Sequence, residues 1–197
     1  MDEHEFETLA ADLPGLTRVG RFVQSLARIP WFANLGEPLT PGAREAGRIY
    51  ADGLGFPDAE IAVVPSWEDA AAAAENLDWN APGWEAEELL RADVTGRAYE
   101  QMSEEALKFS LAAASDSVSE AAAAAVEEAA SLLDIADEEV RQLAVGAAVQ
   151  AAHQALLATI IAEDDPDEGM HPFLAKFQLF EFGRWPVGIA GQTLNLF

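Results

Sequence analysis

The sequence contains no cysteine, and only 11 of its 197 residues are lysine or arginine. Without cysteine the chain can form no disulfide, no thiol nucleophile and no cysteine-ligated zinc site. Its 35 acidic residues give a net charge of −24, and a field of that sign repels nucleic acid and anionic membrane surfaces. We therefore expect neither direct nucleic-acid binding nor membrane binding. The acidic N-terminus lacks an apolar signal segment, which favours a cytoplasmic protein.

Common catalytic and metal-binding motifs are also missing. No serine lies in a Gly-x-Ser-x-Gly turn, and the glycines at 53 and 55 do not follow a predicted strand, as a dinucleotide loop requires. The acidic segment 163–171 gathers carboxylates, but its glycine and glutamate positions do not match an EF-hand. A solvated acidic loop is the simpler interpretation. We therefore expect no metal site and no cofactor.

Helix signals dominate the rest of the chain. Half of the residues are hydrophobic, so the chain can bury a substantial core. Thr40-Pro41 and Ser103 are typical helix starts, and the apolar residues of segment 16–29 recur at helical spacing. We expect an all-α fold, a single domain over residues 1–197 that is a bundle of seven to nine helices. The expected helices cover 3–12, 16–29, 41–53, 67–77, 84–92, 103–114, 117–133, 138–162 and a segment from Pro172 to about 183.

The helix over residues 138–162 should be the centre of this bundle. Residues 143–162 carry no charge, and one side of the helix is a smooth alanine strip that a second helix can approach closely. The short connection after residue 133 predicts antiparallel packing of helix 117–133 against this strip. The uncharged run is long enough to span a membrane. However, polar residues inside it and acidic flanks argue against that reading.

Two apolar segments do not read as helices. Residues 61–64 are apolar and lie between two prolines, but a lone short strand is marginal, so a loop is the better prediction. Segment 184–197 is apolar and rich in glycine, which is unlike a solvated disordered tail. We expect it to lie on the body of the protein.

A polar stripe on helix 138–162 is the first candidate site. It carries Gln150, His153 and Gln154. A histidine titrates near neutrality, and a polar stripe between helices can bind a small molecule. His153 is therefore the candidate acid or base, with the two glutamines as ligand-binding residues. The alternative is a histidine that is hydrogen-bonded within the core, because no acidic residue lies one turn away.

Arginines form the second candidate site. Arg18 and Arg21 share one side of segment 16–29, and Arg44 and Arg48 lie one turn apart in the next helix. Such a set could bind a carboxylate or phosphate group. Alternatively, these arginines pair with the acidic middle of the chain, since residues 52–168 hold 27 acidic side chains and four basic ones.

Large aromatic residues form the third candidate site. Trp31, Phe32, Trp185 and Phe197 could anchor a partner, because tryptophan dominates many interfaces. The alternative is that they pack in the core.

These observations favour a non-catalytic, acidic helical interaction or scaffold protein that binds another protein or forms a homodimer. The alternative is a small-molecule enzyme or ligand-binding protein with a helical pocket near His153. A minor alternative is an acidic protein that mimics nucleic acid. The acidity could equally reflect the habitat or genome composition of the source.

Overall fold

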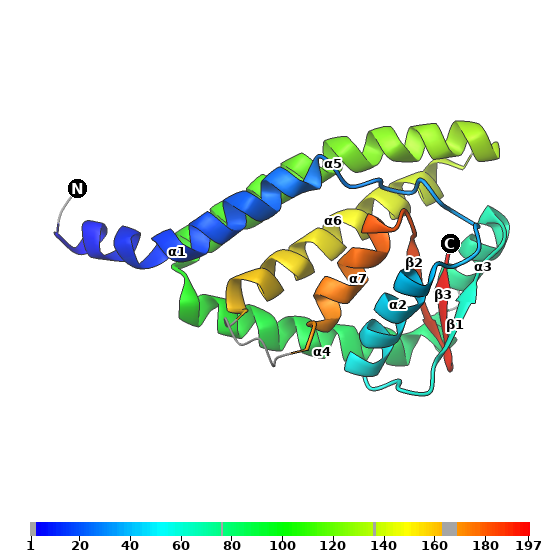
Figure 1. Cartoon of the computed structure of the whole chain (residues 1–197), viewed down its shortest axis with the longest axis horizontal. Coiled ribbons are helices and arrows are strands. Elements are labelled where there is room, and N and C mark those ends of the chain that lie inside the picture. The colour runs from blue at the N-terminus through cyan, green and yellow to red at the C-terminus, as the bar shows by residue number, and fades with distance from the viewer. Residues whose placement is uncertain (1–2, 76, 136, 163–168) are drawn as a thin grey trace.

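The computed structural model describes residues 3–75, 77–135, 137–162 and 169–197, and most of them are helical. Figure 1 shows long helices beside a small sheet. The helices are α1 (Glu3–Leu26), α2 (Pro41–Gly53), α3 (Trp67–Glu75), α4 (Leu77–Gln101), α5 (Glu104–Leu133), α6 (Glu138–Ile161) and α7 (Pro172–Glu181). The strands are β1 (Glu60–Val63), β2 (Pro186–Ala190) and β3 (Thr193–Leu196).

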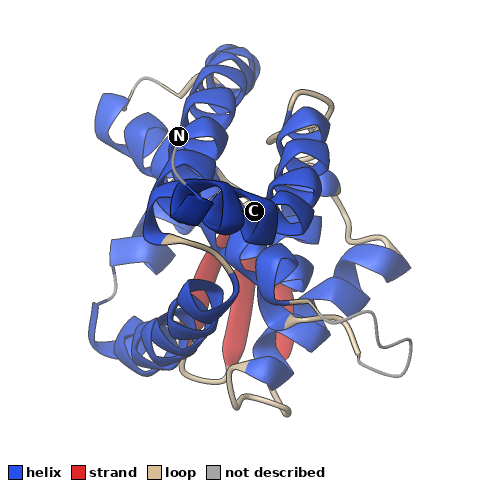
Figure 2. Cartoon of the chain, turned by 90° about the vertical axis from the view of Figure 1, so that its left-hand side faces the viewer, coloured by secondary structure: helices blue, strands red, loops and turns tan. Residues whose placement is uncertain are grey.

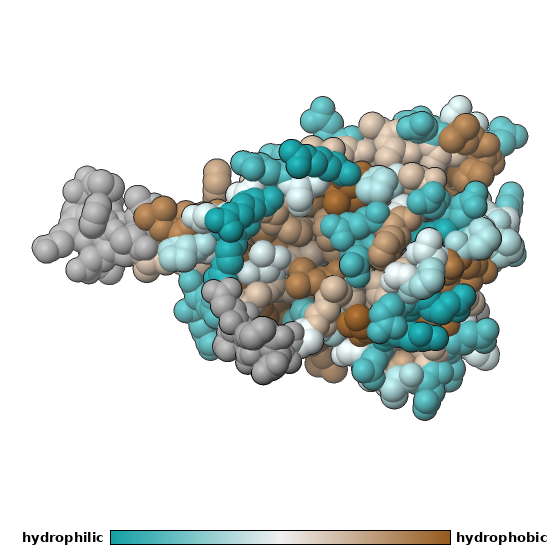
Figure 3. Space-filling model, viewed as in Figure 1, coloured by the Kyte–Doolittle hydropathy of each residue, from teal (hydrophilic) through white to brown (hydrophobic). Residues whose placement is uncertain are grey.

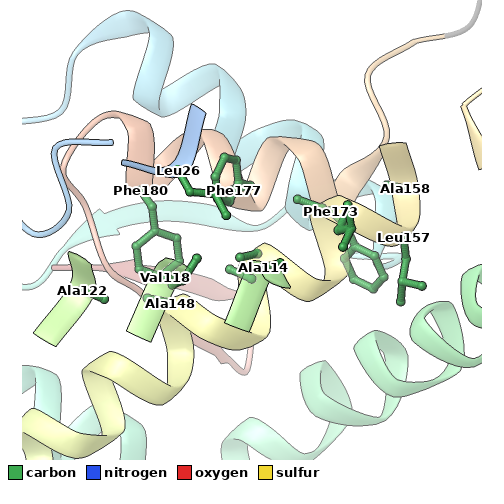
Figure 4. Close-up of a cluster of buried hydrophobic side chains, with 14 of the residues drawn as sticks. Leu26, Ala114, Val118, Ala122, Ala148, Leu157, Ala158, Phe173, Phe177 and Phe180 are labelled. Carbon is green, nitrogen blue, oxygen red and sulfur yellow. The ribbon is translucent and has the colours of Figure 1, made fainter. Parts of the chain in front are cut away.

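Helices α5 and α6 pack against each other over their alanine faces, as predicted. A short loop joins them, and they run antiparallel (Figure 1). Ala114, Val118 and Ala122 of α5 face the side of α6 that carries Ala148 (Figure 4), and all four are fully buried. Small side chains allow the two backbones to come close. This is the most extensive helix contact of the described residues.

Helix α6 also contacts α1, α4 and α7. Within the described residues it is the one helix long and apolar enough to cross a membrane. However, 61% of its most apolar stretch is buried inside the protein. Core helices of soluble proteins combine length and apolar composition in the same way.

Three helices are longer than the sequence predicts. Helix α1 continues through Pro14, and α4 continues through Pro82, although each proline removes a backbone donor. Ser117 and Glu120 have the spacing of a capping box, which favours the predicted helix start at residue 117, but both lie inside α5 and start no helix. Buried residues recur every four positions from Ala114 to Ala130, so packing of this continuous stripe outweighs the local capping signal.

Tertiary hydrogen bonds hold α1 and α4 close to the prolines through which they continue. The carboxylate of Asp12 accepts hydrogen bonds from the backbone and hydroxyl of Ser103 at the start of α5. The Asn80 side-chain amide in α4 donates to the carbonyls of Ala73 and Ala74, near the end of α3. The predicted break at residues 78–83 is therefore wrong because Asn80 is a helical residue that satisfies the neighbouring helix.

The chain is not entirely helical. Segment 60–63 is a strand rather than the predicted loop, because β3 pairs with it in parallel and brings Ile61 opposite Leu194. Strand β2 pairs with β3 in the antiparallel sense, which gives the strand order β1-β3-β2. The three strands lie side by side among the helices (Figure 2). Segment 184–197 thus lies on the body, as expected, but it does so as two strands.

Helix α7 lies between two groups of buried side chains. Phe173, Phe177 and Phe180 pack in the core that α1, α5 and α6 share (Figure 4). Ala175 and Leu179, on another side of the same helix, pack in the core formed by α2 and the sheet. Lys176 lies between these two sides of α7 and is 6% exposed.

Candidate functional site

A cleft of about 980 Å³ lies between α4, the N-terminal half of α6 and strand β2. Helix α4 contributes Trp84, Glu87 and Glu88, which share one side of the helix because they are three and four residues apart. Across the cleft, α6 contributes Glu139, Gln142, Leu143, Gly146, Ala147 and Gln150. The β2 wall runs from Trp185 to Ile189. Trp84 and Leu143 are 46% and 55% exposed, so the cleft opens to solvent.

A buried polar network lies at the base of this cleft. The Glu87 carboxylate of α4 accepts hydrogen bonds from Lys176 Nζ of α7 at 2.7 Å and from Gln154 Nε2 of α6 at 2.6 Å. Its second oxygen accepts a hydrogen bond from the hydroxyl of Tyr50 in α2. Gln150 Nε2 lies 3.4 Å from the first oxygen. Four helices therefore meet at one carboxylate.

The Glu87–Lys176 ion pair is shielded from water, with side chains 13% and 7% exposed. Burial alone would raise the pKa of the Glu87 carboxyl, but the Lys176 charge and three hydrogen bonds lower it below its usual value. Burial, together with the negative charge of Glu87, raises the pKa of Tyr50 well above 10. Glu87 is thus ionised at neutral pH and Tyr50 is a neutral hydrogen-bond donor.

Sequence reasoning did not identify Glu87, Lys176 or Tyr50. Glu87 lies in an acidic helix and looks like a solvated side chain. The position of Lys176 could have indicated a buried site. On a helical wheel it falls within about 40° of Phe180, on the apolar side of α7. A lysine on an apolar face is almost never fully buried without a partner. This position therefore implied a buried acid elsewhere in the chain, although not which one.

The predicted polar stripe is divided between two places. Gln150 lines the cleft, and Gln154 belongs to the buried network. His153 lies instead between α5 and α6, where its Nε2 is 2.8 Å from the Ser115 hydroxyl and 3.2 Å from the Leu111 carbonyl. Burial lowers the pKa of His153, and the hydrogen bond to Leu111 partly opposes this effect. Neither partner is a carboxylate or an arginine, and His153 is not among the residues that line the cleft.

The arginines do not converge on the cleft either. Arg18 donates to the carbonyl of Ala162 at 2.8 Å. Arg44 lies 3.5 Å from the carbonyl of Ile61, and the exposed Arg48 pairs with Glu45 at 3.6 Å. In the part of the chain that the structure describes, the cleft lining includes none of these residues, nor Arg21. The predicted arginine set is therefore not part of this cleft.

The aromatic residues predicted as an exposed anchor are buried. Trp31, Phe32, Trp185 and Phe197 are between 2% and 4% exposed. Trp31 and Phe32 both pack against Phe180, with ring centroids 5.5 and 5.7 Å apart. All four pack in the hydrophobic core. Phe180 of α7 covers Trp31 and Phe32, whereas Trp67 of α3 packs against Trp185 and Phe197. Trp185 is the one of the four that also lines the cleft.

The acidic segment considered for calcium lies largely outside the described residues, at 163–168. His171, at its end, is the N-cap of α7, and its ring Nδ1 accepts a hydrogen bond from the Phe173 backbone at 3.1 Å. Among the described residues no group of three potential ligands could hold a metal ion.

The charged groups at the base of the cleft are held by the protein itself. Both oxygens of Glu87 and the ammonium of Lys176 have hydrogen-bond partners within the chain. Comparison with protein-family models, with curated proteins and with solved structures gives no match.

Proposed function

We propose that this protein binds a small organic molecule in the cleft between α4, α6 and β2. The observation that carries the proposal is a cleft of about 980 Å³ with apolar walls and the Glu87–Lys176 ion pair at its base. Small-molecule sites combine these features, since apolar walls supply affinity and a few fixed polar groups supply orientation. The volume is at the upper end of the range for such sites.

The buried network supports this proposal as a positioning device. It joins α2, α4, α6 and α7 through a single carboxylate, so it fixes the helices that form the cleft. A buried ion pair adds little net stability compared with apolar residues of similar size. Its presence is easier to understand if the cleft needs a rigid, polar base.

Gly146 offers a direct test. A Cβ at this position of α6 would meet no atom within 4 Å, and the residue lines the cleft. Gly146→Trp should therefore fill the cleft and leave the network intact. Gly96→Trp is the matched control, because Gly96 also lies within a helix in open space but away from the cleft.

The experiment is a fragment screen by ligand-observed NMR on the native protein and both variants. We expect a set of fragments that bind the native protein and Gly96→Trp but not Gly146→Trp. If no fragment shows this dependence while both variants keep the native circular dichroism spectrum, the ligand-binding proposal is wrong.

A second candidate function is that of an acidic scaffold or interaction protein. Two observations favour it: the charge of −24, and leucines at the end of α5 that are 78% and 46% exposed at Leu132 and Leu133. Figure 3 shows apolar surface at this end of the molecule. Segment 13–51 is weakly basic, with five arginines and two glutamates. A homodimer could join this segment to an acidic surface of a second copy. Light scattering at low and high salt tests this, since such a dimer should dissociate as salt rises.

The contacts of α6 support a finer description of the fold. Four other helices touch it, and it is mostly buried. On this view α6 is the centre of one helical domain over residues 1–197. A cytoplasmic location is part of the same proposal, supported by the absence of cysteine. Limited proteolysis that released a stable fragment would contradict the single-domain view.

A further inference from the structure

The charges that line the cleft are unequal in sign. Among its described lining residues are three carboxylates, Glu87, Glu88 and Glu139, and one ammonium, that of Lys176. Lys176 is already paired with Glu87. Glu88 pairs with the exposed Arg91, which is not part of the lining. In the described part of the chain, Glu139 is therefore the lining carboxylate that has no lysine or arginine partner. Its negative charge would repel an anionic ligand and attract a cation.

Aromatic rings accompany these carboxylates. Trp84 lies one helical turn before Glu88 on the same side of α4, and its half-exposed indole is accessible from the cleft. Trp185 lines the same cleft from the β2 side. A positive charge over an indole face gains cation–π energy, and an adjacent carboxylate adds to the attraction.

A buried hydrogen-bond acceptor lies behind the β2 wall of the cleft. Asn80 is 2% exposed, and its Oδ1 has no hydrogen-bond partner in the described part of the chain. This oxygen is 3.8 Å from the position that a Cβ on Gly188 would occupy, and Gly188 lines the cleft. The amide nitrogen of Asn80 is held by α3, so the oxygen keeps its orientation toward this wall. Asn80 itself does not line the cleft, so its oxygen contributes a partial negative charge behind the wall rather than a direct contact with a ligand.

From these three features we infer that the ligand is a small organic cation, an ammonium group attached to an apolar body. The ammonium group lies between Trp84 and the carboxylates of Glu88 and Glu139, and the apolar body contacts Leu143 and the β2 wall. This inference rests on the proposed function, because it names the ligand class of the same cleft.

The test compares three probes of similar size: 2-phenylethylamine, which is a cation at pH 7, the neutral 2-phenylethanol and the anionic 3-phenylpropanoate. Binding to the full chain is measured by NMR titration at low salt. We expect the amine to bind at least about fivefold more tightly than the alcohol, and the anion to bind more weakly than both. Raising the salt concentration should weaken the binding of the amine and leave the binding of the alcohol unchanged.

Matched variants locate the effect. Trp84→Leu should remove most of the preference for the amine, whereas Trp79→Leu, an exposed tryptophan of α4 outside the cleft lining, should keep it. Glu139→Gln should weaken the binding of the amine and leave the binding of the alcohol unchanged. Glu105→Gln is its control, because Glu105 also lies in the first turn of a helix and does not line the cleft.

The outcomes separate the two proposals. Equal binding of amine and alcohol, or tighter binding of the anion, overturns the cation inference. If those probes still depend on Gly146, ligand binding in the cleft stands. A preference for the amine that survives Trp84→Leu and Glu139→Gln also overturns the inference. Failure of all three probes to bind the cleft overturns it too, while the fragment screen decides separately whether the cleft binds any small molecule.

Discussion

Lys176 Nζ and Gln154 Oε1 lie 3.0 Å apart, and both residues are almost completely buried. Gln154 donates through its amide nitrogen to Glu87, the same carboxylate that Lys176 contacts. The three side chains therefore form a closed triangle, to which Tyr50 adds a further hydrogen bond. Loss of any member leaves another buried group without its partner, and buried unpaired groups are costly.

Removal of the Lys176 charge should destabilise the fold strongly. In Lys176→Met the Glu87 carboxylate would remain buried without its cation, at a cost of about 3–5 kcal/mol. The double variant Lys176→Met with Glu87→Gln should recover part of this loss, because no charge is then left unpaired. Urea unfolding of the four proteins of the cycle measures the coupling. Lys108→Met is the control, since its pair with Glu104 is fully exposed and should contribute no measurable stability. Additive single-variant effects would contradict the closed triangle.

Glu87 should make the protein sensitive to acid. Its pKa is lower in the folded protein than in the unfolded chain, so the unfolded chain binds the proton at higher pH. The stabilisation is present above about pH 4.3, the ordinary glutamate value, and is lost as the pH falls through the folded pKa. We expect the free energies of unfolding of the native protein and Glu87→Gln to converge as the pH falls below about 4.3 and through the lowered folded pKa of Glu87. Urea unfolding across the acidic range measures this. Curves that stay parallel would show that Glu87 is not held ionised.

His153 should titrate below its ordinary value of about 6.5. Burial lowers its pKa in the folded protein, so the unfolded chain takes up the proton first and the fold loses stability as the pH falls below about 6.5. NMR titration of the imidazole protons gives the midpoint directly. His171, whose pKa burial also lowers, needs separate assignment through His171→Gln. A His153 midpoint at or above 6.5 would show that the ring is solvated.

Replacing glycine with alanine should have opposite effects on stability at two kinds of position. Gly146→Ala and Gly96→Ala should each stabilise the protein by about 0.5–1 kcal/mol, because the new Cβ meets open space and alanine favours helix. Gly53→Ala should destabilise it, since the Cβ would lie 2.0 Å from Pro172 Cγ. Thermal unfolding of the three variants compares these effects. A stable Gly53→Ala would mean that α2 and α7 are farther apart than described.

Much of the helical structure could be predicted from short stretches of sequence. Thr40 is the N-cap of α2 and Ser103 is the N-cap of α5, as their local patterns indicated. The antiparallel pair of α5 and α6 followed from two alanine-rich faces and a short loop. Capping and helical periodicity depend on residues within a few positions of each other, so a single sequence is enough to read them.

The candidate site was only partly readable. Gln150 and Gln154 stood out because polar residues are rare on an apolar helix. Glu87 did not stand out, because a glutamate in an acidic helix looks solvated until its neighbours are known. Its partners Lys176 and Tyr50 lie 89 and 37 residues away in the chain, and nothing local to Glu87 indicates them.

The sequence by itself therefore determined the helical character of this protein, its strong negative charge and the pairing of its two alanine-rich helices. Tertiary structure alone decided that α1 and α4 continue through their prolines, that segment 60–63 becomes a strand and that Glu87 meets Lys176. The reason is physical: helix formation is governed by hydrogen bonds between residues four apart. A short strand or a buried ion pair is stable only when distant segments supply its partners.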